Sequence, residues 1–202
     1  ADPSVVSVSR HLQEDGVSVE TFDAVVAEVP VAMSFNGISY AVMMATPSDL
    51  EDFIRGFAIG EGIVDVARAI FDIEIEFGDV GVSVNATVSN EAAHRLKSRR
   101  RSMAGPSGCG LCGIESIEHM TRDISPLQAT MLPSQAALDK ALSDMRRKQV
   151  VSQSTSGAHA AVWCDMDGNI VSLREDVGRH NALDKLIGWS SLKSANGFVL
   201  VS

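Results

Sequence analysis

Two short apolar runs on either side of Asn36-Gly37 constrain the fold of this 202-residue chain most strongly. The runs occupy residues 29–33 and 38–44, and Asn-Gly is the dipeptide most typical of a two-residue type I′ turn. A type I′ turn matches the twist of the strands that it joins. The sequence therefore predicts a β-hairpin here, with one strand on each side of the turn.

A helix is predicted directly after this hairpin. Ser48 and Glu51 have the spacing of a capping box, and apolar residues follow at helical spacing, namely Leu50, Phe53, Ile54 and Phe57. Two runs with strict alternation, 72–77 and 82–88, then predict two half-buried strands. This order of elements favours a small α+β roll over residues 1–104.

The second half of the chain also alternates between predicted helices and strands. A helix is predicted over residues 134–148, with an inward face made by Leu138, Leu142 and Met145. Strands are expected at 160–164 and 170–173, and another helix starts near Gly178. Residues 197–202 read as a buried strand with no helix after it, so a C-terminal segment is expected to be missing.

These elements predict a fold of the α+β or α/β class with three parts. The small α+β domain covers residues 1–104, a flexible loop and linker cover 105–133, and 134–202 belong to a larger α/β domain. The loop is expected to be flexible because residues 105–114 hold four glycines, one proline and one serine.

Composition and charge exclude several classes of protein. With 45% hydrophobic and 21% charged residues, the chain is not wholly disordered, and no apolar run approaches the roughly 18–20 residues that span a bilayer. Three cysteines do not make a secreted disulfide scaffold, which favours the cytoplasm. A net charge of −9 argues against general nucleic-acid binding, which needs a broad basic surface.

The charge is distributed unevenly along the chain. Residues 1–91 hold 16 acidic and 3 basic residues, whereas 92–105 hold five bases and no acid. A short basic cluster in an acidic protein suits one local anion or one acidic partner. For the run of arginines and lysine taken alone, a solvated helix face is the favoured interpretation.

Cys109 and Cys112 form a CxxC motif between glycines. The motif is compatible with a redox dithiol, with half of a zinc site or with a pair that handles sulfur. A structural zinc site normally needs four ligands, and the chain has no second CxxC, although a histidine could join the pair. The glycines and the nearby arginines favour a reactive pair, since cations stabilise thiolate and persulfide anions. Cys164, inside an apolar strand, is expected to be a core residue.

His159 lies at the start of a predicted strand, where a lone histidine is more often structural, but the Gly- and Ser-rich stretch before it makes a binding role an equal alternative. Nucleobase deaminases use a His-x-Glu motif in which the glutamate moves the proton. Ala161 stands at that position here, which argues against zinc-dependent deamination.

A densely charged stretch leads into the last predicted helix. Arg179 and His180 fall at the N-terminal end of the inward face of this helix, and Asp184 is placed to orient the imidazole of His180. Helix N-termini bind anions through free N–H groups, and a buried arginine needs an anionic partner. An ion pair from Arg179 to Glu175 or Asp176 is the alternative, and an anion site is favoured over it.

Three stretches of this sequence, 107–113, 155–161 and 174–185, resemble the formate dehydrogenase accessory protein (FdhD) family. The resemblance covers most of the chain in the same order, with Ala158 at a position where the family more often has Thr. It implies a cytidine-deaminase-like three-layer fold for the larger domain, a homodimer and a cytoplasmic location.

The resemblance also implies a function, that of a sulfurtransferase. Such a protein takes persulfide sulfur from a cysteine desulfurase and passes it to the bis-molybdopterin guanine dinucleotide molybdenum cofactor, which formate dehydrogenase then receives. Cys109 matches the cysteine that carries the persulfide, and Cys112 matches its partner. The expected cofactor-binding residues are His159, Arg179 and His180. The guanine-dinucleotide loop of the family is expected beyond Ser202.

Two other functions are compatible with the same residues. A cofactor-binding chaperone without covalent chemistry would need Arg179 and His180 but not the cysteines. A zinc-binding module would use Cys109, Cys112 and a histidine.

Overall fold

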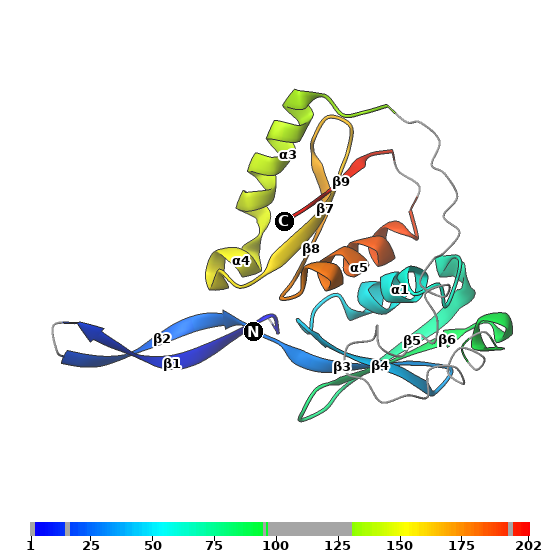
Figure 1. Cartoon of the computed structure of the whole chain (residues 1–202), viewed down its shortest axis with the longest axis horizontal. Coiled ribbons are helices and arrows are strands. Elements are labelled where there is room, and N and C mark those ends of the chain that lie inside the picture. Colours follow the sequence, from blue (N-terminus) through cyan, green and yellow to red (C-terminus); the bar gives the residue numbers. More distant parts are fainter. Residues whose placement is uncertain (1–2, 15–16, 95, 97–130, 194–195) are drawn as a thin grey trace, which may run out of the picture.

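The computed structural model describes residues 3–14, 17–94, 96, 131–193 and 196–202 (Figure 1). Its strands are β1 (Val5–Glu14), β2 (Val17–Val26), β3 (Val29–Phe35), β4 (Ile38–Ala45), β5 (Ile70–Phe77), β6 (Val82–Val88), β7 (His159–Cys164), β8 (Ile170–Asp176) and β9 (Phe198–Val201). Its helices include α1 (Leu50–Gly60), a 3₁₀ turn (Ala67–Ala69), α3 (Gln135–Lys148), α4 (Val150–Thr155) and α5 (Arg179–Ser190), and residues 90–94 are also helical. The CxxC loop lies outside the described residues.

The predicted hairpin is β3–β4. Asn36 and Gly37 have φ angles of 50° and 72°, the positive values that a type I′ turn requires, and the prediction is confirmed. The two alternating runs form β5 and β6, and the four strands make one sheet in the order β4-β3-β6-β5. β3 and β6 are parallel, and the other pairs are antiparallel.

Helix α1 covers one face of this sheet (Figure 1). Its residues Phe53 and Ile54 are fully buried against Met33 and Phe35 of β3. The predicted capping box is wrong, because the helix begins after Asp49, which has a left-handed φ of 51° and makes no side-chain cap.

The second sheet has the order β8-β7-β9 and is covered by a helix on each face. Along β7, Ala160, Val162 and Cys164 pack on the α3 side, while Ala161 packs on the α5 side. The alternation of strand side chains thus produces three layers, α3, the sheet and α5. In β9, Phe198 and Leu200 pack toward α3, whereas Val199 and Val201 are exposed. Its prediction as a buried strand is therefore right for one face only.

Helix α3 begins and ends as predicted, with the Ser134 hydroxyl capping the N–H of Ala137. Of its predicted inward residues, Met145 is buried and Leu138 half-buried, whereas Leu142 is 49% exposed, and Ala137 and Ala141 are buried instead. The small alanines allow the helix to lie close to the sheet, which the larger leucines at the neighbouring positions would prevent.

Helices α1 and α5 join the two halves of the molecule through glycines. A Cβ on Gly56 would overlap with the Asp184 carbonyl, and a Cβ on Gly188 would overlap with the Asp52 carbonyl. The helices therefore cross at backbone contact, with α5 between α1 and the second sheet (Figure 1). The described chain is a mixed α/β structure, and the three domain boundaries remain a prediction.

Strands β1 and β2 form a two-stranded arm that extends away from the rest of the molecule (Figure 1). Opposed residues in an antiparallel pair share a face, and one face of the arm exposes Val6, Val8, Leu12, Val19 and Val25. The sequence analysis assigned no element to this region. Within the described part of the chain, no helix has the length and apolar character needed to cross a membrane.

Candidate functional site

The three predicted cofactor-binding residues lie at one end of the second sheet. His159 is the first residue of β7, and its partner in β8 is Asp176, the last residue of that strand. Arg179 and His180 begin α5 three and four residues later. All three of these predicted side chains are exposed, so solvent and ligands can reach them.

The inward placement predicted for Arg179 and His180 is wrong. The buried residues of α5 begin at Asn181 and continue with Ala182, Lys185, Leu186 and Gly188. The first turn of the helix therefore carries Arg179 and His180 outside the part that packs against α1 and the sheet. Because both are exposed, they face solvent at the start of the helix.

The alternative ion pair from Arg179 to Glu175 or Asp176 is not formed either, because both carboxylates have other partners in the described structure. The Glu175 carboxylate accepts the N–H groups of Val151 and Ser152, at 3.0 and 2.8 Å, where α4 begins. It thereby stabilises the N-terminus of that helix.

The Asp176 carboxylate is completely buried and has four partners. Oδ2 lies 2.7 Å from Nζ of Lys185, also completely buried, and accepts the N–H of Thr46 at 3.0 Å. Oδ1 accepts the N–H of Gly178 at 2.8 Å and the Asn181 amide at 3.0 Å. Burial lowers the pKa of Lys185 from its ordinary value, and the negative charge of Asp176 opposes that shift.

Residues of β4 and the following turn complete this network. The Lys185 ammonium donates to the Thr46 carbonyl at 2.9 Å, and the Asn181 amide donates to the Met44 carbonyl at 2.9 Å. Thr46, Asp176, Asn181 and Lys185 thus form one buried network of hydrogen bonds and an ion pair. It connects the N-terminal sheet to the turn from which Arg179 and His180 project. Thr46, Asn181 and Lys185 are not among the residues that the sequence singles out, since nothing local to Thr46 reveals a partner 130 residues away.

Arg174 makes a second connection between the halves. Its guanidinium lies 2.6 Å from Oδ2 of Asp52 and 3.5 Å from Oδ1 of Asp49. Arg174, Asp176 and Lys185 of the 174–185 stretch therefore make ion pairs that stabilise the fold.

The exposed residues have the chemistry that an anion site requires. Gly178, the N-cap of α5, gives the first turn no side-chain hydrogen bond, so the positive end of the helix dipole is uncapped. Arg179 adds a permanent positive charge, and the rings of His180 and His159 each have an N–H donor. The arrangement suits phosphate or pyrophosphate oxygens.

Asp184 does not hydrogen-bond to His180 in the described structure, contrary to the prediction. The side chain of Asp184 faces the end of α1, with Oδ1 3.4 Å from the position that a Cβ on Gly60 would take. Burial raises the pKa of Asp184 to about 6, and the charge of Glu61 contributes to the same shift.

Cys164 is a core residue, as predicted. It is completely buried, and burial together with the charge of Asp165 raises the pKa of its thiol, which disfavours the reactive thiolate. Among the described residues, no group of three or more His, Cys, Asp and Glu side chains could hold a metal ion. Cys109 and Cys112 lie outside those residues.

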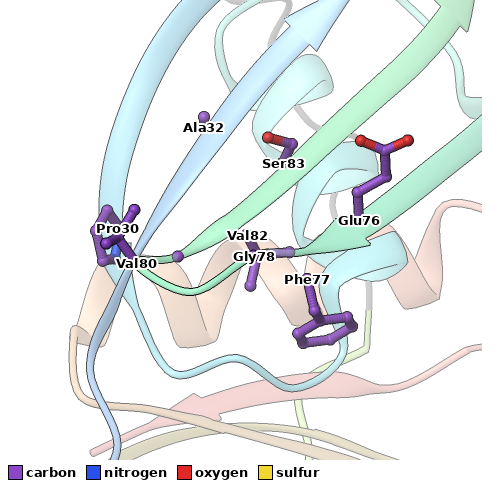
Figure 2. Close-up of a pocket in the computed structure, with 9 residues that line it drawn as sticks. Pro30, Ala32, Glu76, Phe77, Gly78, Val80, Val82 and Ser83 are labelled. Atoms are coloured by element: carbon purple, nitrogen blue, oxygen red, sulfur yellow. The ribbon is translucent and has the colours of Figure 1, made fainter.

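An open cavity of about 310 Å³ lies elsewhere, on the four-stranded sheet (Figure 2). Its lining comes from β3, β5, β6 and the turn after β5, including Pro30, Phe77 and Val82. Glu76 is the only charged residue among those that line it. The cavity contains none of the predicted site residues.

Comparisons with known proteins match the chain over most of its length. The chain is 46% identical to "Sulfur carrier protein FdhD" of Variovorax paradoxus over 89% of the chain and 66% of that protein. It is 48% identical to the protein of the same name from Chromobacterium violaceum, over 98% of the chain and 74% of that protein.

A solved structure shares the fold. A protein described as a formate dehydrogenase accessory protein of Desulfotalea psychrophila has a TM-score of 0.73 and 24% identity, over 98% of this chain and 74% of that one. The chain thus spans about two thirds to three quarters of the length of these relatives. Residues 26–202 match the FdhD/NarQ family, and the chain belongs to that family.

Proposed function

We propose that this protein is a sulfur carrier that supplies sulfur to the molybdenum cofactor of a formate dehydrogenase. The observation that carries the proposal is the exposed group of His159, Arg179 and His180 at the uncapped start of α5, within a chain whose relatives are named sulfur carrier proteins. A carrier of this kind needs a thiol that holds sulfur and a surface that holds an anionic acceptor. The CxxC motif supplies the first requirement and this group the second.

In the proposed reaction, the Cys109 thiolate attacks the outer sulfur of a cysteine persulfide on a cysteine desulfurase. The S–S bond of the donor breaks, its cysteine leaves as thiolate, and Cys109 becomes the persulfide. Cys112 then relays the sulfur or releases it. In a release step, the Cys112 thiolate attacks the inner sulfur of Cys109, a disulfide forms and HS⁻ leaves toward the acceptor.

The acceptor in this proposal is the bis-molybdopterin guanine dinucleotide form of the cofactor. Its pyrophosphate groups match the chemistry of the α5 start, where Arg179 and N–H groups donate to phosphate oxygens. In this proposal His159, which pairs with Asp176 at the start of the neighbouring strand, donates to the same anion.

Activation of a formate dehydrogenase in cells that lack their own carrier tests this function. Cys109→Ala is expected to abolish activation while the protein stays folded, and Arg179→Ala with His180→Ala is expected to reduce it strongly. Ser190→Ala, at the far end of α5, is the matched control and should activate normally. Full activation by Cys109→Ala would contradict sulfur transfer and favour the cofactor chaperone, whose cysteines are dispensable.

Measurement of the zinc content of the purified protein distinguishes the proposed carrier from a zinc-binding module. A zinc-binding module would contain about one zinc ion per chain, lost in Cys112→Ala. The proposed carrier is expected to contain no stoichiometric zinc after purification.

A homodimer, a cytoplasmic location and a cytidine-deaminase-like larger domain belong to the same proposal. The three layers formed by α3, the second sheet and α5 support the fold assignment. The face of the arm that exposes Val6, Val8, Leu12, Val19 and Val25 beside the Arg10–Asp23 ion pair supports a second copy as a partner, because a two-stranded hairpin on its own is only marginally stable in water. Val8→Asp with Val19→Asp on this face should then shift the mass measured by light scattering toward the monomer.

A further inference from the structure

The turn between β8 and α5 is contacted by a residue of the N-terminal half of the molecule. This turn, residues 176–178, directly precedes Arg179 and His180. Its contacts include the side chain and backbone of Thr46, which lies about 130 positions earlier in the chain, where β4 ends. The geometry of the anion site is therefore set partly by a residue that is not near it in sequence.

Thr46 is completely buried, and all of its polar groups are used. Its N–H donates to Oδ2 of Asp176 at 3.0 Å, and its carbonyl accepts from Nζ of Lys185 at 2.9 Å. Its hydroxyl oxygen accepts the N–H of Val177 at 3.0 Å. The first two contacts use the backbone, so only the third depends on the identity of the side chain.

The hydroxyl contact fixes the direction in which α5 begins. Two successive N–H groups of the turn are engaged, that of Val177 by Thr46 and that of Gly178 by Asp176. A Cβ on Gly178 would lie only 2.9 Å from the Asn181 amide nitrogen, so the turn has little room to move in that direction. Because the N–H groups of Val177 and Gly178 are engaged in this way, the N–H groups of the first turn of α5 are the ones that can donate to a ligand.

We propose that Thr46 is a positioning residue for the anion site, and that its hydroxyl, through the Val177 N–H, holds the turn that presents Arg179 and His180. The proposal rests on the proposed function, which makes these two residues part of the cofactor site. Thr46 itself is buried and does not touch the ligand. Its removal should therefore weaken binding without removing any group that contacts the anion.

Isothermal calorimetry with guanosine diphosphate, which carries the guanine and diphosphate parts of the acceptor, tests the proposal on the full chain at 10 °C. Thr46→Val keeps the shape of the side chain and both backbone contacts but leaves the Val177 N–H without its acceptor. It is expected to raise Kd by about three- to tenfold. Thr46→Ser restores the hydroxyl and should bind within about twofold of the unchanged protein.

A control variant separates positioning from general loss of stability. Ser190→Ala removes a hydrogen bond at the other end of α5, where the hydroxyl donates to the Ile187 carbonyl at 3.0 Å. It should lower the melting temperature without changing Kd. If Thr46→Val does not give folded protein by circular dichroism, Thr46→Ala, which also lacks the hydroxyl, takes its place with the same expectation.

The Arg179 and Thr46 variants together distinguish failure of the anion site from failure of the positioning role alone. Arg179→Ala should weaken binding strongly, and unchanged binding by this variant would overturn the anion site and the positioning role together. If Arg179→Ala weakens binding but Thr46→Val binds like the unchanged protein, the positioning role alone is wrong. Equal weakening by Thr46→Ser and Thr46→Val would also overturn it, because the hydroxyl would then make no difference.

Discussion

Single residues of the 174–185 stretch have two kinds of role, and burial separates them. Asp176 and Lys185 are completely buried and paired with each other, whereas Arg179 and His180 are exposed. A buried ion pair is costly to desolvate, and its free energy is favourable only when further hydrogen bonds satisfy both groups. The contacts of Thr46 and Asn181 meet that requirement here.

Removing one partner of this pair should be strongly destabilising. Lys185→Met leaves the Asp176 carboxylate buried without its cation, which is expected to lower the free energy of unfolding by about 3–5 kcal/mol. Adding Asp176→Asn removes the uncompensated charge and should recover part of that loss. Urea denaturation checks both variants, and a single variant as stable as the unchanged protein would contradict the role of the pair.

Asp184 predicts a dependence of stability on pH. Its folded pKa of about 6 lies above the ordinary value of 3.8, so the folded state holds the proton more tightly than the unfolded state. This contribution to stability is fully present below about pH 4 and is lost as the pH rises to about 6. After a discount for partial exposure, it amounts to about 1–2 kcal/mol.

Asp184→Asn, which has no charge to bury, tests this dependence. The variant should gain about 1–2 kcal/mol over the unchanged protein at pH 7.5 and much less at pH 4.5. Chemical denaturation at the two pH values measures the difference. An equal effect at both values would show that the carboxylate does not titrate differently in the folded state.

Among the elements, the crossing of α1 and α5 determines how the two sheets sit together. Gly56 and Gly188 lie where each helix meets the backbone of the other. Helices this close are sensitive to a single added methyl group, because protein interiors have no free volume to absorb it. The crossing also places α5 so that Lys185 reaches Thr46.

Gly56→Ala should therefore separate the helices and destabilise the protein by about 1–3 kcal/mol or more. Gly60→Ala in the same helix is the control, because its Cβ would lie 3.4 Å from the Asp184 side chain, a tolerable contact. Thermal unfolding compares the two. If Gly56→Ala melts at or above the temperature of the control, the close crossing is not tightly packed.

At the scale of the whole molecule, the sequence predicts what depends on local pattern. The Asn36-Gly37 turn and the alternating runs of β5 and β6 are confirmed because backbone preferences and strand alternation act over a few residues. The helix predicted over residues 134–148 is confirmed for the same reason.

What the sequence does not predict depends on contacts between distant segments. Thr46 looks like an ordinary residue before a proline, and only the fold reveals that it lies beside Asp176. Arg179 and His180 were predicted to face inward because helical spacing gives the direction of a face but not where the covering layer ends. The fold thus assigns the roles within the 174–185 stretch.

Peptide mass spectrometry after incubation with a cysteine desulfurase and cysteine, without reductant, tests whether Cys109 carries sulfur as proposed. One or more added sulfur atoms are expected on the peptide that holds Cys109 and Cys112, removed by reductant and absent in Cys109→Ala. The peptide with Cys164 is an internal control and should gain none, since this thiol is completely buried. An unmodified Cys109 peptide in folded protein with an active desulfurase would contradict the proposal.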